Sequence, residues 1–163
     1  LKIYIFIFYM KIYIFDLDDT IIYHPFGIVN YNKMKIDKNV SKILNNLDSP
    51  KFIYSNGTLE HVKEVLNNME LSNTFNKIYA RDTIPYMKPY IESFKFVEQD
   101  IKKYYNDRNK YYFFDDLLDN LKTAKSRGWI TIWINIKFMN CPYYVDYAFP
   151  NVHTAIMYFL IDN

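Results

Sequence analysis

The chain has 163 residues and a mass of 19.8 kDa, the size of one domain that can bury a sizeable core without disulfides or a structural metal. Hydrophobic residues make up 50% and charged residues 23%, a globular balance that excludes an intrinsically disordered chain. A net charge of +2 argues against a dedicated nucleic-acid binder, and the single cysteine, Cys141, excludes an internal disulfide and makes a reducing, cytoplasmic compartment the default expectation.

The first fifteen residues are an apolar run that two lysines interrupt. The run is shorter than the roughly 20 residues of a membrane-spanning helix, and it lacks the small-residue cleavage site of a signal peptide. Met10 directly precedes Lys11 to Phe15, which by itself is a complete buried strand. We therefore expect residues 1–9 to be a non-native or upstream extension and expect no membrane partner. The alternative is that residues 3–7 form an edge strand or an oligomer contact.

Short apolar runs rich in β-branched and aromatic residues alternate along the chain with segments of helical period. The predicted strands are Lys11 to Phe15, Lys51 to Tyr54, Lys77 to Ala80, Lys110 to Phe114 and Trp129 to Ile134. The predicted helices are Lys38 to Leu47, Thr58 to Met69, Ile91 to Tyr105, Leu117 to Arg127 and Val152 to Ile161. This alternation predicts an α/β fold with a mainly parallel sheet covered by helices on both faces. Residues 21–35 lack a clear period and are predicted to be a hairpin or an irregular flap within one domain, residues 10–163.

Polar residues follow the predicted strands where a ligand would bind, because the ligand site of an open parallel sheet lies beyond the carboxyl ends of its strands. These residues are Asp16, Asp18, Asp19 and Thr20, then Ser55, Asn56 and Gly57, then Lys88 before the third helix, and finally Asp115 and Asp116. Several carboxylates held together repel one another unless a cation neutralises them, and hard oxygen ligands favour Mg²⁺. The sequence therefore predicts an acidic Mg²⁺ site that a lysine faces.

The order and spacing of these segments resemble the haloacid dehalogenase-like (HAD) phosphohydrolase superfamily. The first motif, a hydrophobic strand followed by Asp-x-Asp-x-Thr, is matched by residues 14–20, and the second by residues 53–57. The third is Lys88-Pro89, and the fourth is residues 113–116. The resemblance implies a three-layer, doubly wound Rossmann-like fold from residue 11 to about residue 134. The gaps between motifs are too short for a cap domain, so a capless member with an open site is expected.

The resemblance also implies chemical roles. Asp16 is the expected nucleophile, which forms an aspartyl-phosphate, and Asp18 the expected general acid and base. Ser55 and the backbone amide of Asn56 would bind phosphate oxygens. Lys88 would neutralise the charge that develops on the phosphoryl group.

The implied Mg²⁺ ligands are Asp16, the backbone carbonyl of Asp18, and Asp116. In the commonest fourth motif an Asp stands four residues after the metal ligand, where this chain has Asn120. Asp115 is therefore kept as an alternative to Asp116. Thr20 and Asn120 are secondary site candidates.

The second Asp of the first motif favours phosphate hydrolysis or transfer over dehalogenation. We therefore predict a Mg²⁺-dependent phosphomonoesterase that acts on a small phosphorylated substrate. Local resemblance to pyrimidine 5′-nucleotidase-type members makes nucleotides candidates, and local resemblance to the capless magnesium-dependent phosphatase type agrees with the length. An open site also suits phosphoproteins or nucleic-acid ends, or an oligomer partner that supplies a lid.

The alternative from another class is a non-catalytic interaction module with the same fold. Retention of both Asp16 and Asp18 argues against it, because a degenerate member commonly loses one of them. His24 and His61 have no motif to support a role, and both are interpreted as surface or core histidines.

Overall fold

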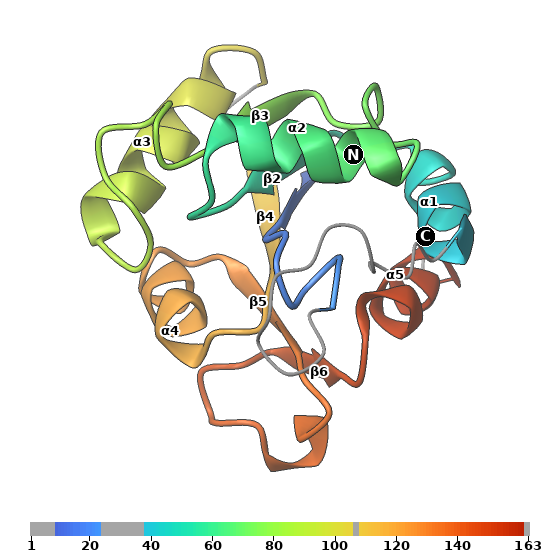
Figure 1. The fold of residues 1–163 in the computed structure, drawn as a ribbon. Helices are drawn as coiled ribbons and strands as arrows, with labels where there is room; N and C mark the ends of the chain where they lie inside the picture. The colour runs from blue at the N-terminus through green and yellow to red at the C-terminus, as the bar shows by residue number, and fades with distance from the viewer. Residues whose placement is uncertain (1–8, 24–37, 106–107, 162–163) are drawn as a thin grey trace, which may run out of the picture.

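The computed structural model describes residues 9–23, 38–105 and 108–161. In this part of the chain six parallel strands form one sheet with the order β3-β2-β1-β4-β5-β6 (Figure 1). The strands are β1 (Met10–Phe15), β2 (Lys51–Tyr54), β3 (Lys77–Tyr79), β4 (Asn109–Asp115), β5 (Ile130–Ile134) and β6 (Tyr147–Phe149). The helices are α1 (Lys38–Asn45), α2 (Leu59–Asn68), α3 (Ile91–Lys102), α4 (Leu118–Ser126) and α5 (Val152–Ile161), with a short 3₁₀ helix at Phe138–Asn140.

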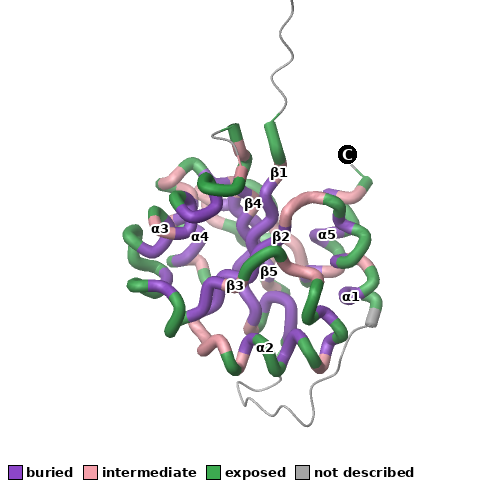
Figure 2. Tube along the Cα trace, turned by 90° about the horizontal axis from the view of Figure 1, so that it is seen from above, coloured by how far each residue is buried: buried purple, intermediate pink, exposed green. Residues whose placement is uncertain are grey.

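The sheet has a separate hydrophobic core on each face, and alternation along β1 shows how they arise. Tyr13 and Phe15 point to the core that α1, α2 and α5 cover, whereas Ile12 and Ile14 point to the core under α3 and α4. All four side chains are fully buried. Because a central parallel strand must be apolar on both faces, β1 is apolar without interruption from Ile12 to Phe15. The buried strands lie between the two helix layers in Figure 2.

The strand order reverses beside β1, which pairs with β2 on one side and with β4 on the other. The chain builds β1, β2 and β3 in one direction and then crosses back to place β4 against the free side of β1. Such a reversal leaves a crevice at the carboxyl ends of the strands, where ligands bind in open α/β sheets. Phe15 pairs with both Ile53 and Phe114, so the residues that follow these three strands emerge side by side.

The observed elements confirm the predicted α/β architecture, with boundaries that differ by a few residues. The predicted third helix extends to Tyr105, but α3 ends at Lys102, where the amides of Lys103 and Tyr104 bond three residues back, to the carbonyls of Asp100 and Ile101, in the tighter pattern of a terminal turn. Two elements were not predicted: the edge strand β6 and the 3₁₀ helix before it.

Between Gly57 and Lys88 the structure contains only α2 and β3, which agrees with the expected absence of a cap domain in that gap. The expected flap lies mostly outside the described residues, and so does the N-terminal extension except for Tyr9. Among the helices of the described ranges, none has the length and apolar character needed to cross a bilayer.

Candidate active site

In the three residues after β1, successive side chains point to opposite sides of the backbone. Leu17 is fully buried in the core, while Asp16 and Asp18 on either side of it line a common cavity. The carbonyl of Leu17 accepts hydrogen bonds from the amides of Ile21 and Ile22, at 2.9 and 3.1 Å, and so closes a tight turn. The turn therefore presents both carboxylates at the end of the strand.

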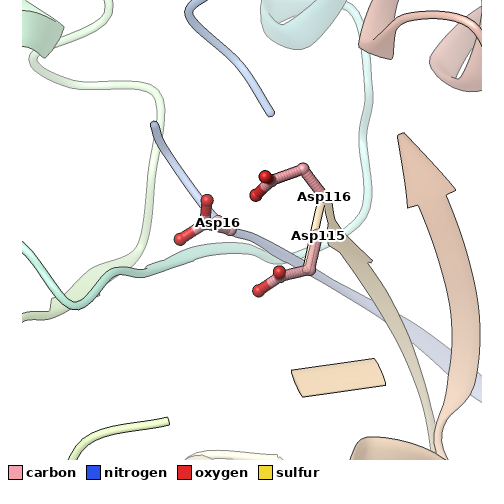
Figure 3. A group of neighbouring side chains, drawn as sticks. All are labelled: Asp16, Asp115 and Asp116. Atoms are coloured by element: carbon pink, nitrogen blue, oxygen red, sulfur yellow. The ribbon is translucent and has the colours of Figure 1, made fainter. Parts of the chain in front are cut away.

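Three carboxylates from two neighbouring strands meet at this edge of the sheet. Asp16 follows β1, and Asp115 and Asp116 come at the end of β4; Figure 3 shows their carboxylates in one region. Each can offer one oxygen so that the three oxygens lie within 4.8 Å of one another. The predicted convergence of Asp16 with the fourth motif is therefore observed.

Lys88 lies between two of these carboxylates. Its Nζ is 2.7 Å from Oδ1 of Asp16 and 2.7 Å from Oδ2 of Asp115, and its side chain is almost fully buried. The side chain of Asn56 holds the lysine backbone in place: Lys88 N donates to Asn56 Oδ1 at 3.0 Å, and Asn56 Nδ2 donates to the Lys88 carbonyl at 2.9 Å. Asn56 of the second motif thus positions Lys88 of the third. The predicted role of Asn56 was only to bind phosphate through its backbone amide.

Asp115 and Asp116 differ in their surroundings. Asp115 is fully buried, and its oxygens accept hydrogen bonds from Lys88 Nζ, the amide of Leu117 and Nδ2 of Asn120. Asp116 is half-buried and lines the cavity. The protein therefore uses Asp115 to hold neighbouring groups, while the Asp116 carboxylate is available at the cavity. This difference favours Asp116 as the ligand for a cation.

Burial changes the acidity of these groups. It raises the pKa of Asp16 to about 7, with Lys88 opposing the shift and Asp115 adding to it. Burial, together with the charges of Asp115 and Asp19, also raises the pKa of Asp116 to about 7. Burial by itself lowers the pKa of Lys88, but Asp115 and Asp16 raise it more, so the lysine stays protonated.

The residues present fit a divalent cation. When Asp16, Asp115 and Asp116 are ionised, the single positive charge of Lys88 leaves the cluster with two negative charges. The available donors are carboxylate oxygens, which Mg²⁺ prefers over softer metals. A bound cation would also favour the ionised forms of Asp16 and Asp116.

The cavity beside the cluster has a volume of about 350 Å³. Its lining contains the predicted site residues Asp16, Asp18, Ser55, Asn56, Lys88, Asp116 and Asn120, together with Asp19, Gly57 and Leu117. Thr20 is different: it lines a second cavity, of about 450 Å³, on the side of Ile21 and Val152. The structure thus brings together most of the predicted site and leaves Thr20 in the supporting turn.

His61 was missed by the sequence interpretation. Its Nε2 lies 2.9 and 3.0 Å from the two carboxylate oxygens of Asp18, although the two residues are 43 positions apart. The interpretation of His61 as a surface or core histidine did not include this contact with a predicted site residue. Its position in the first turn after Ser55-Asn56-Gly57 was the available signal, because the N-terminus of that helix faces the site.

No protein-family model and no sequence of a curated protein matches the chain. Solved structures do match. YfnB of Bacillus subtilis, classed as a HAD-hydrolase and bound to magnesium, is 18% identical with a TM-score of 0.65, over 78% of this chain and 56% of that one. A predicted phosphoglycolate phosphatase from Haemophilus somnus is 17% identical with a TM-score of 0.62, over 78% of this chain and 59% of that one.

A haloacid dehalogenase-like family hydrolase from Streptococcus pneumoniae is 13% identical, with a TM-score of 0.66, over 92% of this chain and 98% of that one. The chain has the HAD-like fold. It spans somewhat more than half the length of YfnB and of the Haemophilus protein.

Proposed function

We propose that this protein is a Mg²⁺-dependent phosphomonoesterase that works through an aspartyl-phosphate. The observation that carries the proposal is the meeting of Asp16, Asp115 and Asp116 with Lys88 at one edge of the sheet, where the ionised cluster has two more negative charges than Lys88 can neutralise. Fold alone cannot separate the chemistries of HAD-like proteins, so the assignment depends on these residues. The presence of Asp18 beside the nucleophile supports phosphate chemistry over dehalogenation, because only the former needs a proton donor for the leaving oxygen.

Asp16, Asp116 and the backbone carbonyl of Asp18 would hold the metal ion. When bound, Mg²⁺ supplies charge neutralisation for the phosphoryl oxygens. The Asp16 carboxylate attacks phosphorus, and Lys88, held within hydrogen-bond distance of Asp16, offsets the negative charge that builds up there. Ser55 and the Asn56 amide are the candidate donors to the remaining phosphate oxygens.

The proposed substrates are small phosphate esters, with nucleotides as the first class to examine. The absence of a cap between Gly57 and Lys88 leaves the cavity accessible from that side, which also suits a phosphoprotein or a phosphorylated nucleic-acid end. A lid supplied by another subunit would instead restrict the site to small esters.

The test is release of p-nitrophenol from p-nitrophenyl phosphate with and without Mg²⁺, using Asp16→Asn as the control for contaminating activity. We expect Mg²⁺-dependent turnover that Asp16→Asn lowers by at least about 10³-fold. A panel of nucleoside monophosphates, a phosphopeptide and a 5′-phosphorylated oligonucleotide would then rank the substrate classes. Halide release from a 2-haloacid, or absence of hydrolysis on every ester, would contradict the proposal; the latter would favour a non-catalytic interaction module.

A further inference from the structure

His61 contacts the Asp18 carboxylate with its ring, and its backbone is fixed by the N-terminal cap of α2. Thr58 caps α2 by accepting a hydrogen bond from the His61 amide at 3.3 Å, which fixes the backbone of the first turn. The side chain is only 14% exposed, whereas that of Asp18 is 34% exposed. A nearly buried ring therefore meets a carboxylate that lies at the mouth of the cavity.

Gly57 provides the space that the ring occupies. A Cβ atom at residue 57 would lie 2.7 Å from Cδ2 and 3.6 Å from Cγ of His61, and 3.2 Å from Oγ of Ser55. Carbon atoms do not approach to 2.7 Å without displacement of one of them. The backbone of Gly57 on one side and Asp18 on the other thus leave the imidazole little freedom to move.

We propose that His61 is a positioning residue that fixes the orientation of the Asp18 carboxyl group for proton transfer. The inference rests on the proposed phosphatase function. Nε2 contacts both carboxylate oxygens, at 2.9 and 3.0 Å, so one N–H group restrains the rotation of the whole carboxylate. This pair of contacts limits the rotamers that the partly exposed Asp18 side chain adopts.

Asp18 takes part in both halves of the proposed reaction. In the first, a bond forms between an Asp16 oxygen and phosphorus, the bond from phosphorus to the ester oxygen breaks, and the Asp18 proton moves to that oxygen. In the second, water bonds to phosphorus and gives a proton to Asp18 while the bond from Asp16 to phosphorus breaks. Phosphate leaves, and both carboxyl groups return to their starting forms.

The contribution of orientation depends on the leaving group. An alkoxide is a poor leaving group and needs the Asp18 proton, whereas p-nitrophenolate leaves readily without one. A misplacement of about 1 Å in a reacting group costs on the order of 10²-fold in rate. Loss of His61 should therefore slow the first half-reaction for alkyl esters selectively, and the second half-reaction for all esters.

The experiment compares ethyl phosphate with p-nitrophenyl phosphate in His61→Leu, which removes the N–H donor, and in His61→Gln, which keeps one at similar reach. For His61→Leu we expect kcat/KM on ethyl phosphate to fall by roughly 30- to 100-fold and kcat/KM on p-nitrophenyl phosphate to fall by less than about 3-fold. The kcat on p-nitrophenyl phosphate should fall as well, so KM falls and a pre-steady-state burst of p-nitrophenol appears. His61→Gln should recover most of the loss on ethyl phosphate.

Gly57→Ala is the second variant, because it keeps the imidazole but displaces the ring. It should show the same selectivity between the two esters and covers the case in which His61→Leu does not fold. Equal losses on both esters, or identical behaviour of the Leu and Gln variants, would overturn the positioning role while the phosphatase function stands. A wild-type protein that hydrolyses neither ester would overturn both proposals.

Discussion

Asn120 and Asp115 face each other in the interior: Asp115 is the last residue of β4, and Asn120 lies in the first turn of α4. Nδ2 of Asn120 lies 3.0 Å from both carboxylate oxygens of Asp115, and both side chains are buried. An Asp at residue 120 would put a second negative charge against Asp115, with only Lys88 to offset the pair. The departure from the commonest fourth motif thus has a local physical reason: here an amide donor fits where a carboxylate would repel.

We predict that Asn120→Asp lowers the free energy of unfolding by about 1–3 kcal/mol at pH 7, because like charges in a buried site are unfavourable. Urea denaturation measures the change. The double variant Asp115→Asn/Asn120→Asp restores one carboxylate and one amide and should recover part of the loss. Wild-type stability in the single variant would contradict this account of the pair.

The two acidic residues at the end of β4 should respond differently to substitution. Asp116→Ala should raise the Mg²⁺ concentration needed for half-maximal turnover by at least tenfold. The free energy of unfolding should stay within about 1 kcal/mol of the wild-type value, since the Asp116 carboxylate faces the cavity. Asp115→Ala removes a buried partner of Lys88 and should cost about 3–5 kcal/mol in stability. Mg²⁺ titration of activity and urea denaturation of both variants separate the two effects. A greater loss of metal affinity in Asp115→Ala would reverse the assignment of the ligand.

At the scale of single elements, α4 ends where the sequence places a glycine. Gly128 has a φ of 77°, in the left-handed region that favours glycine, and its amide donates to the carbonyl of Lys125 at 2.9 Å. A Cβ at this position would have no atom within 4 Å, so backbone conformation alone opposes a side chain there.

We predict that Gly128→Ala lowers the free energy of unfolding by about 1 kcal/mol and leaves turnover unchanged. Gly57→Ala is the matched comparison, because its obstacle is the His61 ring and its main effect should be on activity. Thermal melts and p-nitrophenyl phosphate turnover of both variants make the comparison. A large loss of activity in Gly128→Ala would show that the end of α4 affects the site, contrary to expectation.

The elements that could be predicted are those whose pattern is local. Strand β1 ends in four consecutive apolar residues, Ile12 to Phe15, and α2 begins at a Thr58 cap and continues with apolar residues at helical spacing. Strand β6 has only three residues, two of them half-buried and one exposed, so its burial pattern has too little period to be recognised. Its strand character comes from pairing with β5, which is not encoded in its own residues.

The same distinction holds for the site. Asp16, Asp18, Ser55, Lys88 and Asp116 could be predicted because each follows a recognisable strand or precedes a helix. The contact of His61 with Asp18 and the contacts of Asn56 with the Lys88 backbone could not be predicted, because each joins segments that lie 43 or 32 residues apart in the sequence. Such contacts depend on how the loops and helices around the site pack together, which the local sequence pattern does not show.

At the scale of the whole molecule, the buried Asp100 and the more exposed Asp146 each connect a helix to the sheet near one of its two edges. Asp100 in α3 accepts hydrogen bonds from Lys77 and Tyr79 of the edge strand β3. Asp146, just before the opposite edge strand β6, accepts from Lys125 of α4 and from the amide of Thr131 in β5. Burial opposes ionisation at both positions, but these donors outweigh it, and the pKa of each carboxyl lies below its usual value.

The sign of the resulting pH dependence follows from linkage. Because the pKa of each group is lower in the folded than in the unfolded protein, the unfolded chain binds these protons more readily. The stabilisation is thus complete above the unfolded pKa, about 3.9, and disappears as the pH falls through the folded pKa.

We predict that Asp100→Asn/Asp146→Asn is less stable than wild type by about 1–3 kcal/mol at pH 7, and that the difference in the free energy of unfolding narrows steadily below about pH 4. Thermal and urea unfolding from pH 7 to pH 3 measure this difference, with Glu64→Gln/Glu70→Gln, at two exposed positions, as a control for the loss of two negative charges. A difference between wild type and double variant that stays constant down to pH 3 would mean that packing around the two side chains, and not their charge, holds the edges of the sheet.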